Sequence, residues 1–240
     1  MFYKLLIFSL FSQTFAFQLM VPKITKVISA TAVGTSLFYN KIENKQPITH
    51  SAMVHNANGF TKPTNIVVER NNVYLYGDIS PDSCEELKNK LNDLDFNGRL
   101  FKISYGTTPP PINLHIQSNG GSLMNALYIV DLIDNLETPV NTYVDGYAAS
   151  AASLISVMGK ERYMTKNSMI LIHQLSSGRE GKYEELHDDN ENLIMLMDKL
   201  KTIYMEHSHI SEEILDNILK HDLWLDAERC KQYGLIDKII

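Results

Sequence analysis

The first recognisable pattern of secondary structure begins near residue 64, where short apolar stretches predict β-strands. Residues 66–68 and 73–76 are rich in Val, Ile, Leu and Tyr and flank Asn71-Asn72, so we expect a β-hairpin. Ser80-Pro81 predicts the start of a helix, because proline fits the first helical position. One face of this helix is apolar and carries Cys84, Leu87, Leu91 and Leu94. Consecutive prolines within 106–111 predict a loop after it.

From residue 112 onward, strand patterns alternate with helix patterns. Strands are expected at 112–117 and 140–145, and each is followed by a helical pattern, the first after Gly120-Gly121 and the second over 150–158. A further strand is expected at 168–173. Strands that alternate with helices imply parallel, right-handed β-α-β units. The expected fold class is therefore α/β.

The longest helical pattern runs from Lys182 to about His207 and is mostly polar or charged. Its apolar positions include Leu193, Leu196, Met197, Leu200 and Ile203. A helix this long and polar does not fold readily into a compact core, so we expect it to project and to pack on another subunit. A helix from Ser211, a strand at 223–225 and a helix capped by Asp226 and closed by Gly234 are expected to complete the chain.

The first sixty residues differ in composition from the rest. Residues 1–16 combine Lys4, a short apolar run and a small residue at a plausible cleavage point, which is typical of a signal peptide. Residues 17–42 are basic, rich in hydroxyls and free of acidic residues, as transit peptides are. Phe17 directly after the cleavage point resembles the bipartite leader of algae with complex plastids. We expect a signal peptide at 1–16, a transit peptide and flexible leader at 17–60, and a plastid destination, with the mitochondrion as the alternative.

Length and charge limit what the remaining residues can do. The chain has 240 residues and a net charge of −6, which fits one folded domain at 61–240 and argues against nucleic-acid binding. No apolar run is long enough to keep the mature form in a membrane. Cys84 and Cys230 form neither a CxxC motif nor a cluster with histidines at metal-ligand spacing. We therefore expect buried thiols and no bound metal.

Three residues carry candidate catalytic chemistry. Ser150 lies among small residues in Gly146-Tyr147-Ala148-Ala149-Ser150-Ala151-Ala152, where a strand gives way to a helix whose free N–H groups favour negative charge. His173 ends an apolar strand, and Asp222 precedes another. A hydroxyl, a base and an orienting carboxylate are what serine hydrolysis requires. Taken singly, each residue has a structural alternative: a helix N-cap, a structural histidine and a surface carboxylate.

Gly120-Gly121 follows a strand and precedes a helix, so it offers backbone N–H groups with no side chain in the way. Such a turn could bind an oxyanion, cradle a nucleotide phosphate or serve only as a connection. Neither GxGxxG nor GxxxxGK[ST] is present, which disfavours the phosphate site.

The motifs together resemble the Clp protease proteolytic subunit, a family of serine peptidases with the ClpP/crotonase fold. The resemblance rests on Asn119-Gly120-Gly121, the run from Gly146 to Ser150, Ile172-His173-Gln174 and the run from Tyr233 to Asp237, in the family's order. It covers about residues 65–239. It implies repeated β-α units with a projecting long helix, the handle, after residue 182.

The resemblance also implies a role for each candidate residue. Ser150 would be the nucleophile, His173 the base and Asp222 the third member of the triad. The N–H groups of Gly121 and Ala151 would form the oxyanion hole, and Gly120 would contact substrate.

Assembly and partners are implied in the same way. Subunits would form heptameric rings stacked in pairs, alone or together with paralogues, and would degrade unfolded polypeptides inside the chamber. An AAA+ unfoldase would consume ATP, and the subunit itself would need no cofactor. Asn119 and Leu175 replace prolines usual in the family, and the segment at 97–111 is enlarged. The alternatives are a crotonase-type acyl-CoA enzyme, which shares the fold, and a non-catalytic ring subunit.

Overall fold

The computed structural model describes residues 66–240. The signal peptide expected at 1–16 and the transit peptide and leader expected at 17–60 lie outside the described residues, as do residues 61–65. No helix within 66–240 combines the length and the apolar character needed to cross a membrane.

An eight-stranded mixed sheet organises the described residues. Its main path is β1-β2-β3-β4-β5-β8, and β6 pairs with β4 and with β7. The pairs β1–β2 and β6–β7 are antiparallel, and the other pairs are parallel. The strands are β1 (Ile66–Glu69), β2 (Asn72–Tyr76), β3 (Ile112–Ser118), β4 (Val140–Ala149), β5 (Arg162–Met164), β6 (Met169–Leu171), β7 (Trp224–Asp226) and β8 (Lys238–Ile239).

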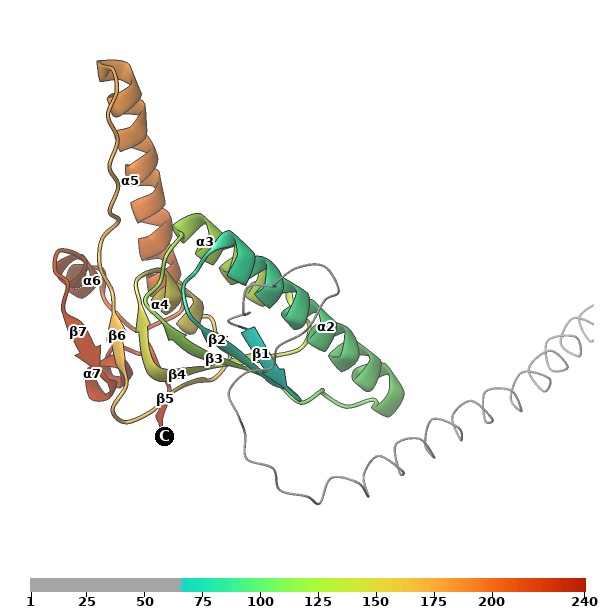
Figure 1. Cartoon of the computed structure of the whole chain (residues 1–240). Coiled ribbons are helices and arrows are strands. Elements are labelled where there is room, and N and C mark those ends of the chain that lie inside the picture. The colour runs from blue at the N-terminus through green and yellow to red at the C-terminus, as the bar shows by residue number, and fades with distance from the viewer. Residues whose placement is uncertain (1–65) are drawn as a thin grey trace, which may run out of the picture. The chain divides into compact units, whose positions relative to one another are not determined.

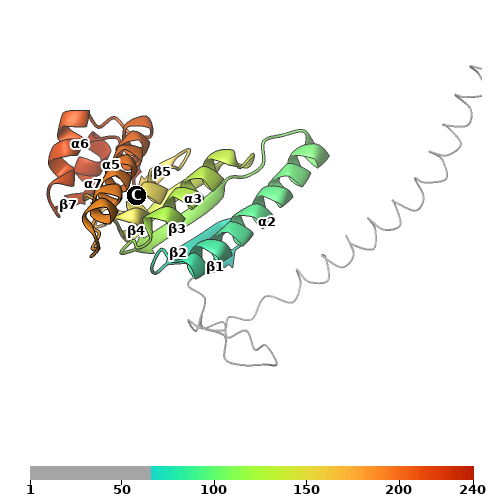
Figure 2. The ribbon, with the colours of Figure 1, turned by 90° about the horizontal axis from the view of Figure 1, so that it is seen from above.

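Helices α2 (Pro81–Tyr105), α3 (Leu123–Asn135) and α4 (Ala151–Ser156) lie along one side of this sheet (Figures 1 and 2). Helix α5 (Tyr183–Glu206) extends away from the sheet, and the segment after β6 runs beside it (Figure 1). Helices α6 (Glu212–Leu219) and α7 (Ala227–Gln232) lie next to β6 and β7. The predicted α/β class is confirmed, and so is the long helix.

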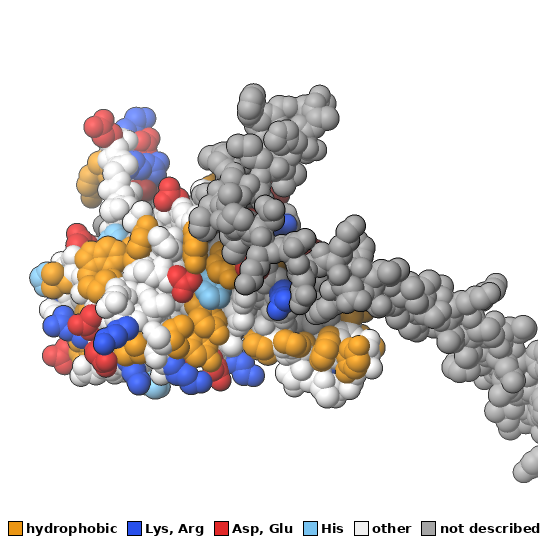
Figure 3. All heavy atoms as spheres, turned by 60° about the horizontal axis from the view of Figure 1, so that its bottom comes forward, with side chains coloured by type: hydrophobic (Ala, Val, Ile, Leu, Met, Phe, Trp, Pro, Cys, Tyr) orange, Lys and Arg blue, Asp and Glu red, His pale blue; other side chains and the backbone are white. Residues whose placement is uncertain are grey.

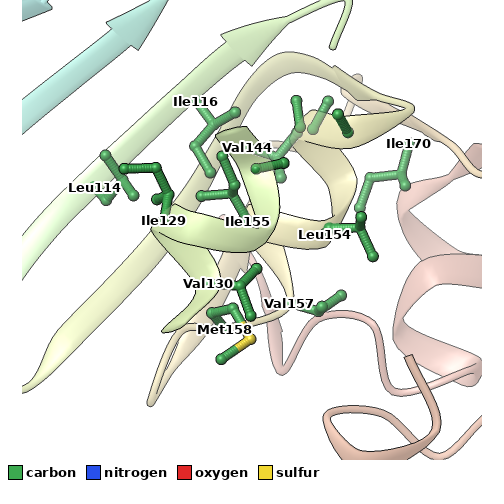
Figure 4. Packing of buried hydrophobic residues seen from close by; sticks show 14 of the residues in the cluster. Leu114, Ile116, Ile129, Val130, Val144, Leu154, Ile155, Val157, Met158 and Ile170 are labelled. Carbon is green, nitrogen blue, oxygen red and sulfur yellow. The ribbon is translucent and has the colours of Figure 1, made fainter. Parts of the chain in front are cut away.

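Alternation along the central strands produces the core. In β3, Ile112, Leu114 and Ile116 are buried, whereas the residues between them face the other side of the sheet. Leu114 and Ile116 pack with Ile129 of α3 and Ile155 of α4 (Figure 4). Complete burial of one such side chain contributes about 1.5–3 kcal/mol. The same packing fixes the register of β3 and β4, because a slip by one residue would turn polar side chains into the core.

The opposite face of the sheet carries a row of aromatic rings. Tyr74, His115, Tyr143 and Tyr163 are cross-strand neighbours on β2, β3, β4 and β5, and successive ring centroids lie 4.6–4.7 Å apart. Asp145 accepts hydrogen bonds at this face from Tyr76 at 2.9 Å and contacts His115 Nδ1 at 2.7 Å.

Several boundaries differ from the sequence pattern. Helix α2 continues well beyond the apolar stripe that ends at Leu94, because Asp95 and Gly98 are buried against Thr138. The Asp95 carboxylate accepts the Thr138 N–H at 2.7 Å, and a Cβ on Gly98 would lie 2.1 Å from Thr138 Oγ1. Strand β4 continues to Ala149 rather than ending at 145, and the short strands β5 and β8 were not predicted.

Candidate active site

Three parallel strands end side by side, and the candidate residues follow them. β3 pairs with β4 with Ser118 opposite Ala148, and β4 pairs with β6 with Ala149 opposite Leu171. Gly120 and Gly121 therefore follow β3, Ser150 follows β4, and His173 follows β6 at the same edge of the sheet. The carboxyl edge of parallel strands is where α/β proteins place their sites.

The antiparallel pairing of β6 with β7 brings Asp222 to the same place. Leu171 of β6 lies opposite Trp224 of β7. Because the two strands are antiparallel, His173, two residues after Leu171, comes across from Asp222, two residues before Trp224. His173 Nδ1 lies 3.7 Å from Asp222 Oδ1. This distance is within ion-pair range but longer than a hydrogen bond of about 2.7–3.2 Å. The Asp222 side chain is 82% exposed, so solvent screens this contact.

Ser150 adopts a backbone conformation that non-glycine residues rarely accept. Its φ is 54° and its ψ is −127°, at the junction of β4 and α4. Such a conformation costs about 1–3 kcal/mol and persists only where its surroundings enforce it. The Ser150 N–H donates to the Leu171 carbonyl at 2.8 Å, and the Ser150 carbonyl accepts from the Ser153 N–H at 2.9 Å. The turn resembles the sharp strand-to-helix elbow that exposes a nucleophilic serine in α/β-hydrolases.

The hydroxyl of Ser150 is not used as a helix cap, which was the structural alternative for this residue. The α4 N-cap makes no side-chain hydrogen bond to the helix, and the Ser150 side chain is half-buried at the sheet edge.

Gly120 contacts the serine so closely that no side chain fits there. A Cβ on Gly120 would lie 2.8 Å from Ser150 Cβ and 2.5 Å from the Ala149 carbonyl oxygen. Gly120 also has a φ of +91°, and its N–H is held by Ser118 Oγ at 3.1 Å. The diglycine turn and the serine turn are therefore packed as one unit.

The N–H of Gly121 is left available by the bonds around it. Ile79 donates its N–H to the Gly120 carbonyl and accepts the Ser122 N–H, both at 2.8 Å, so it holds the chain on either side of Gly121. Among residues 66–240, none of the backbone hydrogen bonds outside regular elements uses the Gly121 N–H. Ala151 is the first residue of α4, so its N–H has no carbonyl partner inside the helix. Gly121 and Ala151 thus offer two donors beside Ser150.

Sequence reasoning missed two residues that build this site. Ser118 and Ile79 shape the diglycine turn through the hydrogen bonds described above, and both are buried. A serine at the end of a strand, two residues before Gly120-Gly121, was a readable signal for Ser118. Ile79 gave no signal, because its contribution comes from backbone atoms.

The cysteines are not rival nucleophiles. Cys84 and Cys230 are free and buried, as predicted. Burial raises the pKa of both thiols, that of Cys230 to about 12. A thiol with so high a pKa stays protonated and inert near neutral pH. Within the part of the chain that the structure describes, no three His, Cys, Asp or Glu side chains are grouped so that they could hold a metal ion.

Comparisons with known proteins point to one family. The family model for Clp protease matches residues 60–240. The ATP-dependent Clp protease proteolytic subunit 1 of Rhodopirellula baltica is 29% identical over 177 residues, which cover 73% of this chain and 74% of that protein. A solved structure of a ClpP1 mutant from Listeria monocytogenes has the same fold, with a TM-score of 0.61 and 23% identity over 71% of this chain and 91% of the other.

Gly120→Ala should sharply reduce the reactivity of Ser150, because the new Cβ collides with the serine turn. We expect the labelling rate of Ser150 by a fluorophosphonate probe to fall at least about tenfold, in keeping with the sensitivity of reactive geometry to displacements near 1 Å. Gly146→Ala is the matched control, since Gly146 has the same φ of +91° but its nearest non-neighbouring atoms lie 3.8 Å from a new Cβ. Equal losses in both variants would show that backbone strain alone, and not contact with Ser150, is responsible.

Proposed function

The chain belongs to the Clp protease family, whose members are peptidases, and on this premise we propose that it is a serine endopeptidase with Ser150 as its nucleophile. The observation that supports the proposal is the register of β4, β6 and β7, since Ser150 and His173 follow the last paired residues of β4 and β6 and Asp222 precedes β7 at the same sheet edge. Ser150 stands at a strained turn there, and its side chain does not cap α4.

His173 would act as the general base. It would take the proton of the Ser150 hydroxyl as the oxygen attacks the peptide carbonyl, and would return that proton to the departing amine. Water would then attack the acyl-enzyme with His173 again as base, which releases the new carboxylate and restores Ser150.

Asp222 would orient the imidazole and stabilise its protonated form. The His173 Nδ1–Asp222 Oδ1 contact of 3.7 Å supports this pairing of base and carboxylate, although it is longer than a hydrogen bond. Catalytic hydrogen bonds are often long in a free enzyme and shorten when substrate binds. The three residues need neither a metal nor an organic cofactor for these steps.

The N–H groups of Gly121 and Ala151 would stabilise the oxyanion. The tetrahedral intermediate places a negative charge on the former carbonyl oxygen, and fixed donors aimed at that oxygen are worth about 10²–10³ in rate each. Gly120, which has no side chain, would let a substrate backbone approach the serine. The bonds that Ile79 makes on either side of Gly121 support the first assignment. Gly120 is buried and its missing Cβ would meet Ser150 and Ala149, so what supports the second is its close packing against the serine turn.

Self-association is the second part of the proposal. Among residues 66–240, the buried residues of helix α5 are Leu200 and Tyr204, and the helix exposes Tyr183, Leu186, Ile194 and Met195. Helix α2 exposes Phe96, Leu100 and Ile103, which share one face. Apolar side chains also gather at the surface shown in Figure 3. We propose that these surfaces pair in stacked heptameric rings, formed by this chain alone or with paralogues, which enclose a chamber for unfolded polypeptides. An AAA+ unfoldase would dock on the rings and hydrolyse the ATP.

The alternatives fit less well. A crotonase-type acyl-CoA enzyme would not require Ser150, His173 and Asp222 at one edge, and the matching family model is that of a protease. A non-catalytic ring subunit would have no use for a strained serine at the same sheet edge as a histidine–aspartate pair.

A plastid destination remains a proposal from leader composition. Residues 1–60 fused to a fluorescent protein should direct it to the plastid in an alga with complex plastids. Fluorescence confined to mitochondria or to secreted material would contradict this destination.

Replacement of the nucleophile tests the catalytic proposal. Ser150→Ala should abolish hydrolysis of a fluorogenic peptide, with a loss on the order of 10⁶-fold expected from removal of a serine nucleophile. Negative-stain imaging should show the same particles for the wild type and the variant. Undiminished hydrolysis by Ser150→Ala, or no hydrolysis by assembled wild-type particles, would contradict the proposal.

Asp222→Asn tests the third member. We expect kcat to fall at least about 10²-fold with little change in KM, because an amide no longer stabilises the charged imidazole. Asp216→Asn is the control, since Asp216 is another exposed carboxylate with a basic partner, Lys201 at 2.8 Å. A loss in Asp222→Asn no greater than in Asp216→Asn would exclude Asp222 from the triad.

A further inference from the structure

A buried pair of hydroxyls holds the carbonyl of the candidate nucleophile. Ser153 is fully buried in α4, and its Oγ lies 2.6 Å from the Ser150 carbonyl oxygen. The same Oγ lies 2.6 Å from the phenol oxygen of Tyr204, which reaches it from α5. The Ser153 N–H also donates to the Ser150 carbonyl at 2.9 Å. The carbonyl of Ser150 thus accepts two hydrogen bonds from one residue.

The direction of these bonds follows from proton counting. A carbonyl oxygen can only accept, so Ser153 Oγ must donate its single proton to Ser150. Tyr204 must therefore donate to Ser153. Complete burial raises the pKa of the Tyr204 phenol far above its ordinary value, which keeps that proton in place. The result is a chain from the Tyr204 hydroxyl to the Ser153 hydroxyl to the Ser150 carbonyl, in which each bond polarises the next.

This chain acts on more than the Ser150 carbonyl. The peptide group that carries the Ser150 C=O also carries the Ala151 N–H, and in a planar trans peptide the two bonds point in opposite directions. A carbonyl anchored toward Ser153 therefore fixes the N–H of Ala151 toward the other side. Polarisation of the carbonyl also makes the N–H of the same group a stronger donor.

We propose that Ser153 and Tyr204 are positioning residues that aim and strengthen the Ala151 N–H as an oxyanion donor. The inference rests on the proposed function, in which Ala151 contributes to the oxyanion hole. Neither residue touches substrate. Both act through the Ser150–Ala151 peptide group, which follows the unfavourable backbone conformation of Ser150 and needs an anchor for that reason.

Tyr204 places part of this anchor on the projecting helix. Leu200 and Tyr204 are the buried residues of α5, so the phenol is where that helix meets α4 and the catalytic turn. The packing of α5 against α4 therefore affects the direction of the Ala151 N–H.

Tyr204→Phe and Ser153→Ala in the full-length, assembled protein test the inference. The concentration of active sites is first measured by exhaustive fluorophosphonate labelling, so that kcat is calculated per reactive serine. We expect kcat to fall about tenfold in each variant, with KM nearly unchanged. This loss is smaller than the loss of about 10²–10³ in rate that removal of a whole oxyanion donor causes. Affinity for a peptide boronate, which forms a tetrahedral anion on the serine, should fall by the same factor as kcat/KM. The double variant should be no slower than Ser153→Ala, because the two hydroxyls act in series.

Ser156→Ala is the matched control. Ser156 is a buried serine of the same helix, but its hydroxyl donates to the Ser153 carbonyl at 2.8 Å and not to Ser150. It should keep wild-type kcat and boronate affinity even where its thermal stability falls.

Two failures are distinguishable. If Ser150→Ala remains active and wild-type Ser150 is not labelled, the proposed function itself is wrong. If Ser150 is labelled and essential but Tyr204→Phe keeps kcat and boronate affinity within twofold of wild type, the positioning role is wrong. Equal losses in Ser156→Ala would overturn it as well, because they would mark a general packing effect. Should Ser153→Ala fail to assemble, Tyr204→Phe decides alone, since it removes one oxygen and keeps the ring.

Discussion

The backbone at Ser150 is the constraint on which the site depends. A non-glycine residue at a φ of 54° is unfavourable by about 1–3 kcal/mol, so its neighbours must compensate. They do so from three directions: the Leu171 carbonyl on β6 receives the serine N–H, Ser153 binds the serine carbonyl, and Gly120 packs against the side chain without a Cβ of its own. The core packing of β3 and β4 fixes the register that brings these groups together.

The same constraint links the separate parts of the site. One tight turn places the hydroxyl of Ser150 at the sheet edge, presents the Ala151 N–H beside it and fits against the diglycine turn that carries the Gly121 N–H. The antiparallel pairing of β6 with β7 adds Asp222 across from His173. The proposed triad and oxyanion hole therefore follow from strand register and from the strained backbone conformation of Ser150, and the exposed surfaces of α2 and α5 are left for the proposed assembly.

Much of this was predictable from the sequence, and the parts that were not have physical reasons. Local patterns sufficed for the α/β class, the hairpin, the long helix and the place of Ser150, His173 and Gly120-Gly121 each at a strand end, whereas their grouping into one site was implied by the family resemblance. Strands β5 and β8 were missed because segments so short carry no reliable periodicity. Tyr204 and Ser153 are 51 positions apart, and nothing local marks a phenol that reaches a hydroxyl on another helix. The placement of His173 across from Asp222 depends on the pairing of two strands with three residues each, which no local pattern marks, so before the fold was known it rested on the family resemblance alone.

The most direct test of the central claim is a structure of the assembled protein with a peptide boronate. We predict a covalent bond between boron and Ser150 Oγ, with one boronate oxygen about 2.7–3.1 Å from the N–H nitrogens of both Gly121 and Ala151. A boronate bound to another residue, or one whose oxygens point away from these two N–H groups, would contradict the account.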